Sequence, residues 1–113
     1  MSYGPSSAPS RPQILLHEIV RQHYPDAVLD QHVYTLGGRD RWIDIFIPTL
    51  DVAIEYMGKQ WHASEEQKER DKARKEELED LGFRVIEVSK SNVLLFICYL
   101  KDYVENGLEL PKR

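Results

Sequence analysis

The chain has 113 residues, of which 42% are hydrophobic and 30% are charged. This length suits one domain with an ordinary core, so neither disulfides nor a structural metal is needed for stability. Cys98 is the single cysteine, which excludes an intrachain disulfide and makes a reducing compartment, the cytoplasm, the simplest interpretation. The formal net charge of −4 counts against a simple nucleic-acid-binding protein. It leaves room for a metal-dependent enzyme, because clustered carboxylates hold divalent cations.

Neither a secretory signal nor a membrane span is expected. Residues 1–12 are rich in Ser, Gly and Pro and lack an apolar segment, which predicts a disordered tail rather than a signal peptide. The longest apolar run, residues 93–100, is far shorter than the roughly 20 residues that span a bilayer. We therefore expect one domain over residues 13–113 and no membrane partner.

The first half of that domain predicts a helix and a meander of strands. The helix begins after the tail and ends near Tyr24-Pro25, and its stripe at 3.6-residue spacing comprises Ile14, Leu15, Glu18, Ile19 and Gln22. Residues 27–36, 41–47 and 52–57 have the composition of strands. Turn residues at 37–38 and 48–51 separate them.

The second half predicts a long helix, a strand and a last helix. Residues 63–81 contain no Gly or Pro and are rich in Glu, Lys and Arg, and Gly82 follows at a position where helices favour glycine. Residues 83–88 form a short apolar strand. Ser91 is the expected cap of a last helix that ends at Asn106. The order of elements predicts an α/β fold with a central mixed sheet.

Two carboxylates stand out in the second and third predicted strands. Side chains two residues apart share a face of a strand, so a hairpin can turn Asp44 and Glu55 to the same side. Burying two like charges is costly, and a hard divalent cation with oxygen ligands removes that cost. Alternatively, Asp44 pairs with Arg39 or Arg41, and Glu55 pairs with a lysine of the long helix.

A wider pattern connects these acids to a known family. The pattern consists of the segments Trp42-Ile-Asp-Ile-Phe-Ile-Pro48, Ala53-Ile-Glu-Tyr-Met-Gly-Lys-Gln-Trp-His62, Asp71-Lys-Ala-Arg74, Leu78, Gly82-Phe-Arg-Val-Ile-Glu-Val88 and Ser91-Asn-Val93. In this order and spacing the chain resembles PD-(D/E)XK nucleases, within the branch similar to very-short-patch-repair endonucleases. The resemblance implies a restriction-endonuclease-like core and hydrolysis of phosphodiester bonds in DNA with Mg²⁺ or Mn²⁺.

The resemblance also implies roles for individual residues around the third strand. Asp44 and Glu55 would be the metal ligands, with the Ile54 or Tyr56 carbonyl as a further oxygen. The family motif has lysine two residues after the acid, where this chain has Met57.

Several residues are candidates to replace the missing lysine. Gln60 is the first candidate, since its amide can orient a water or a phosphate, and Lys59, Lys68 or Lys75 could also reach the site. His62 is a candidate general base, phosphate contact or extra ligand; a surface histidine at a helix start is an equally weighted alternative.

Helical residues could complete the site. Arg74 lies on the same face of the long helix as Leu78 and could hold phosphate, although an internal ion pair with Asp71 or Glu55 is the favoured alternative. Lys68, Lys75 and Arg41 are further candidates for nucleic-acid binding. Glu18 of the first helix is a candidate metal ligand, as related nucleases often carry an acid there, and simple surface exposure is the favoured alternative.

Residues 93–100 are apolar on every side of the predicted last helix. One face must cover the sheet, and a homodimer could cover the other, unless the first helix and the tail do so.

Two other functions compete with the nuclease. One is a catalytically inactive nuclease fold that binds nucleic acid or protein, which Met57 and the net charge favour. The other is a small dimeric interaction protein.

Overall fold

The structure, a computed structural model, describes residues 9–58 and 64–111. Its elements, in chain order, are α1 (Arg11–His23), β1 (Val28–Tyr34), β2 (Asp40–Ile47), β3 (Val52–Gly58), α2 (Glu65–Asp80), β4 (Arg84–Ser89), α3 (Val93–Cys98) and α4 (Leu100–Glu105). The predicted order is confirmed up to the last helix, which is divided into α3 and α4.

The strands form one four-stranded sheet in the order β1-β2-β3-β4. The first three strands are antiparallel neighbours, as a meander requires, and β4 pairs parallel to β3. Helix α2 supplies the crossover that a parallel pair needs. The predicted α/β class with a mixed sheet is therefore confirmed.

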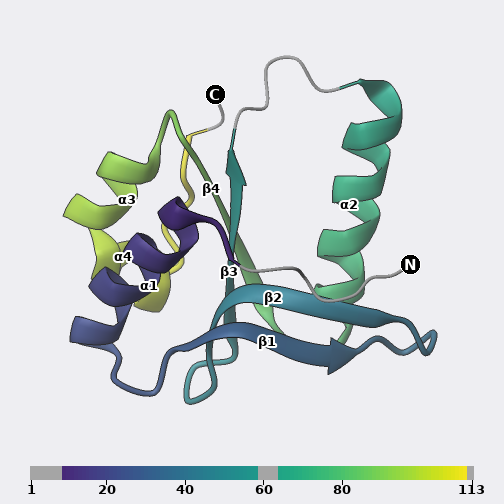
Figure 1. The fold of residues 1–113 in the computed structure, drawn as a ribbon, viewed down its shortest axis with the longest axis horizontal. Helices are drawn as coiled ribbons and strands as arrows, with labels where there is room; N and C mark the ends of the chain where they lie inside the picture. The colour runs from purple at the N-terminus through teal and green to yellow at the C-terminus, as the bar shows by residue number, and fades with distance from the viewer. Residues whose placement is uncertain (1–8, 59–63, 112–113) are drawn as a thin grey trace.

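Helices cover both faces of the sheet (Figure 1). Helices α1, α3 and α4 lie on one face, where the larger core gathers buried side chains such as Val20, Ile45 and Phe96. Helix α2 lies on the other face, where Leu78 packs with Ile43, Phe46 and neighbouring residues in a smaller core. The site described below lies between these two cores.

Helix α1 begins earlier than the sequence suggested. The Ser10 hydroxyl accepts from the Gln13 amide at 3.4 Å, and the Gln13 side chain accepts from the Ser10 amide at 2.7 Å, which makes a capping box. Arg11 and Pro12 therefore belong to the helix and not to the tail, and proline suits this first turn because the free amides there need no partner within the helix.

The last helix differs from the prediction at its start and in its middle. Asn92, not Ser91, precedes α3, and its side chain makes no capping hydrogen bond to the helix. At Tyr99 the backbone leaves helical geometry, with φ −121° and ψ 40°. The break lets side chains from both short helices, among them Phe96, Leu100 and Tyr103, enter the same core. Packing on the sheet has overridden continuous helical periodicity.

Among the helices in the described ranges, none is both long and apolar enough to cross a membrane.

Candidate functional site

The two strand carboxylates lie where β2 and β3 separate. The register between these strands runs from Ile47 opposite Val52 to Ile45 opposite Ile54. At the next position the side chains take over the hydrogen bonding. The Asp44 amide donates to Glu55 Oε2 at 3.2 Å, and the Tyr56 amide donates to Asp44 Oδ2 at 2.8 Å. Each carboxylate is thus held by the backbone of the opposite strand.

Glu55 is almost completely buried, at 5% exposure. The Arg74 Nε of α2 donates to its Oε1 at 2.9 Å, and the guanidinium and carboxylate form an ion pair. The pKa of Glu55 is raised from 4.5 to about 7, chiefly by burial and also by the nearby charge of Asp44, against the opposing effect of Arg74. The hydrogen bonds that Asp44 and Glu55 exchange with the opposite strand place the two residues close to each other.

Asp44 is partly buried and is approached from two helices. Burial raises its pKa, while the Tyr56 amide, a hydrogen bond from the Gln13 side chain and the charge of Arg74 lower it. Gln13 belongs to the first turn of α1 and Arg74 to the middle of α2. The carboxylates therefore occupy the meeting point of β2, β3 and both helices.

Two further acids, which the sequence did not single out, lie in the same row across the sheet. Glu87 of β4 is the register partner of Glu55. Asp30 of β1 is close enough for its charge to raise the pKa of Asp44. The alternation of β4, with Val85 and Glu87 on one face, was a signal that could have drawn attention to Glu87.

The donor atoms of the two carboxylates suit a divalent cation, but the arrangement of described side chains around them does not form a complete metal site. Asp44 and Glu55 supply hard oxygen donors whose charges repel each other, which is the situation that Mg²⁺ or Mn²⁺ relieves. Within residues 9–58 and 64–111, however, no group of three or more His, Cys, Asp or Glu side chains is placed to hold a metal. Both oxygens of Glu55 already accept hydrogen bonds. A metal at Glu55 would therefore compete with Arg74 for the same carboxylate.

The two arginines proposed to bind nucleic acid are engaged with carboxylates. Arg74 is paired with Glu55 and also donates to the Trp42 carbonyl, so the favoured internal ion pair is what the structure shows. Arg41 pairs with Glu77 of α2 at 2.8 Å. Asp44 thus does not take Arg41 as its partner. These pairs fasten α2 to β2 and β3.

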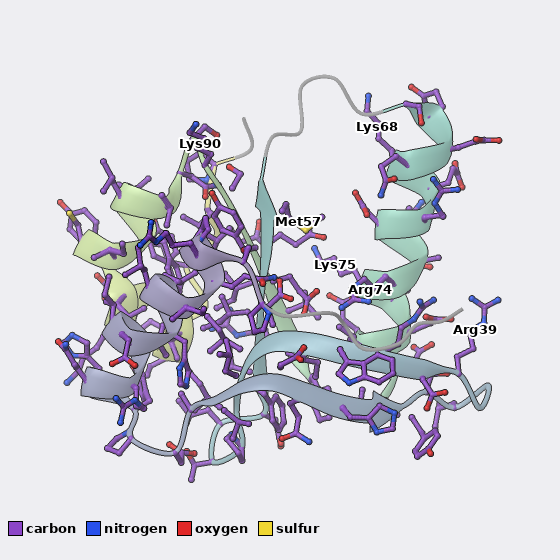
Figure 2. The ribbon with its side chains drawn as sticks, viewed as in Figure 1. Arg39, Met57, Lys68, Arg74, Lys75 and Lys90 are labelled. Carbon is purple, nitrogen blue, oxygen red and sulfur yellow. The ribbon has the colours of Figure 1, made fainter. Side chains whose placement is uncertain are left out.

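The two candidate lysines of α2 lie in different surroundings. Lys68 is exposed in the N-terminal part of the helix and pairs with Glu65 at 3.7 Å. Lys75 is half-buried and extends, in the view of Figure 2, from α2 toward Met57 of β3. Met57 is itself half-buried, two residues after Glu55. Of the two lysines, Lys75 is the one directed at the site.

Glu18, the remaining candidate that the structure describes, is not brought to the two carboxylates. Glu18 pairs with Arg21 at 2.9 Å, and both side chains are half-exposed at 52%. From α1 it is Gln13, an amide, that approaches Asp44. Lys59, Gln60 and His62 lie outside the described residues.

Comparisons with protein-family models, with curated proteins and with solved structures found no match for this chain.

Proposed function

We propose that this chain is a metal-dependent nuclease with a restriction-endonuclease-like core of the PD-(D/E)XK type, which hydrolyses phosphodiester bonds in DNA. The observation that carries the proposal is the pair of the partly buried Asp44 and the buried Glu55, held where two neighbouring strands separate. A buried acidic pair is unfavourable in an inert sheet, and binding sites are where such arrangements concentrate. The predicted motif placed these acids on these strands.

Asp44 and Glu55 would hold Mg²⁺ or Mn²⁺, which activates a water and stabilises charge on the phosphate. Arg74 would then leave Glu55, because the metal takes over the task of neutralising that carboxylate. Its guanidinium lies beside the same carboxylate and has the planar geometry that binds phosphate oxygens in pairs. Tyr56 and Gln13 keep Asp44 in place by hydrogen bonds.

Plasmid cleavage in Mg²⁺ and in Mn²⁺ tests the proposal. Asp44→Ala and Glu55→Ala should each lower the rate by at least ~100-fold, since removing a metal ligand removes much of the transition-state stabilisation. Glu79→Ala, at an exposed position of α2, is the matched control and should cut like the wild type. Circular dichroism checks that each variant is folded. Undiminished cutting by both site variants would rule the site out.

A second candidate is a catalytically inactive nuclease fold that binds nucleic acid or protein. The ion pair between Arg74 and Glu55 favours it, since an internal cation already compensates the carboxylate, and so does Met57 at the lysine position. Mn²⁺ titration by calorimetry separates the two. The nuclease binds Mn²⁺ and loses binding in Asp44→Ala, whereas an adaptor has no need to bind it.

We also propose a homodimer through α3. Leu94, Leu95 and Tyr99 remain exposed at 74%, 38% and 54%, so the apolar run retains a face that the core does not cover. A symmetric partner would bury it. The exposed thiol of Cys98 on the same helix fits the reducing cytoplasm that we expect for this protein.

A further inference from the structure

The strand position that carries lysine in the family motif holds a side chain without charge. Met57 follows Glu55 by two residues on β3, at the point where the pairing of β3 with β4 shifts register between Tyr56 and Gly58. A methionine thioether neither carries charge nor donates a hydrogen bond. A nuclease with this strand needs a cation from another element.

Helix α2 is held at two points against the face of the sheet that carries Glu55. Leu78 is fully buried in the core with Ile43 and Phe46, and Arg74 is bonded to Glu55. Lys75 follows Arg74 directly and lies one turn before Leu78, so its backbone is fixed between the two anchors. Its side chain is half-buried and extends toward Met57 (Figure 2).

Lys75 also differs in its electrostatics from the three other described cations proposed for the site. Arg74, Arg41 and Lys68 each form an ion pair with a glutamate. Lys75 forms none with any residue in the described part of the chain. A partly buried ammonium without a counterion favours the approach of an anion, and an ammonium on a flexible four-carbon stem can follow that anion.

We propose that Lys75 replaces the missing motif lysine and contacts a non-bridging oxygen of the substrate phosphate beside Glu55. This inference rests on the proposed nuclease function and selects one residue among the alternatives Lys59, Gln60, Lys68 and Lys75. Lys75 keeps its proton throughout. Its charge balances the additional negative charge that the phosphate gains as the attacking oxygen bonds to phosphorus and the leaving oxygen departs.

Cleavage rates of four variants test the assignment. Lys75→Met keeps an unbranched apolar stem of similar length and removes the positive charge. It should lower kcat by about 100-fold, the usual loss of one electrostatic donor. Lys75→Arg retains the charge and should stay within about tenfold of the wild type. Lys72→Met, at an exposed position of the same helix, should cut normally. Met57→Lys combined with Lys75→Met should regain at least about tenfold, because it restores the ammonium on the strand.

A binding measurement without metal gives a readout that does not depend on cutting. Anisotropy of a labelled DNA duplex in EDTA should show weaker binding for Lys75→Met, and the slope of log K against log salt should fall by about 0.9, the value for one lost phosphate contact. Lys72→Met should change neither the affinity nor the slope by as much.

The outcomes separate this inference from the proposed function. If the wild type cuts, Asp44→Ala does not, and Lys75→Met equals Lys72→Met in rate and in slope, Lys75 is excluded and the nuclease stands. A large loss in Gln60→Ala with none in Lys75→Met would assign the role to Gln60. If the wild type does not cut in Mg²⁺ or Mn²⁺, both proposals are overturned.

Discussion

Replacing Glu55 with glutamine should change how the stability of the fold depends on pH. Burial raises the pKa of Glu55 from 4.5 to about 7 in the folded protein, so the folded state holds the proton more tightly than the unfolded state does. The resulting stability is fully present below pH 4.5 and is lost as the pH rises to 7. A difference of about 2.5 pKa units corresponds to about 3 kcal/mol of unfolding free energy.

Urea denaturation at pH 5, 6, 7 and 8, followed by circular dichroism, measures this effect. The stability of the wild type should fall over this range by about 2 to 3 kcal/mol more than that of Glu55→Gln. Glutamine has one carbonyl oxygen for the two donors that Glu55 accepts from, Arg74 and the Asp44 amide. The difference in slope is therefore the test, and not the absolute stability.

The control for this experiment is Glu79→Gln, at an exposed position of α2, which should keep the pH dependence of the wild type. Asp44, whose pKa is also raised by burial, contributes a slope of the same sign in every variant. An equal pH dependence in the wild type and in Glu55→Gln would refute the reasoning about burial.

Two more predictions concern α2 and the proposed dimer. Leu78→Ala empties a fully buried position and should destabilise the fold by about 2 to 5 kcal/mol in urea denaturation, whereas Leu94→Ala, at an exposed position, should cost far less; similar losses would show that α2 is not anchored by Leu78. Leu94→Glu should convert a dimer to a monomer in light scattering. Phe96 does not suit this test because its side chain is fully buried. A wild type that is monomeric at micromolar concentration would exclude the dimer and leave the nuclease proposal untouched.

The sequence alone determined the order of the elements and the strands that carry the acids. Local signals were sufficient for this: alternation in the strands, the absence of Gly and Pro over α2, and Gly82 at its end, where φ is +95°. The same alternation put Asp44 and Glu55 on neighbouring strands. Alternation could not show that β2 and β3 separate at Asp44 and Glu55. The separation depends on which hydrogen bonds the two backbones exchange.

The course of the last helix was decided by the tertiary structure. Its sequence is apolar all round and shows no stripe, so periodicity did not predict the break at Tyr99. The sheet selected which side chains are buried. Phe96 and Tyr103 enter the core, while Leu94 remains exposed, because helices that bend over a twisted sheet bury more apolar surface than one straight helix does.

The partners of the two acids were also decided only by the tertiary structure. Arg74 and Lys75 are adjacent in the sequence and equally cationic, yet one is bonded to Glu55 and the other has no carboxylate partner among the described residues. Gln13, distant in sequence, reaches Asp44 from α1. The sequence fixes which charges exist and on which element each lies. Which of them meet depends on the rotation and placement of whole helices, and buried side chains such as Leu78 set these by packing against the sheet.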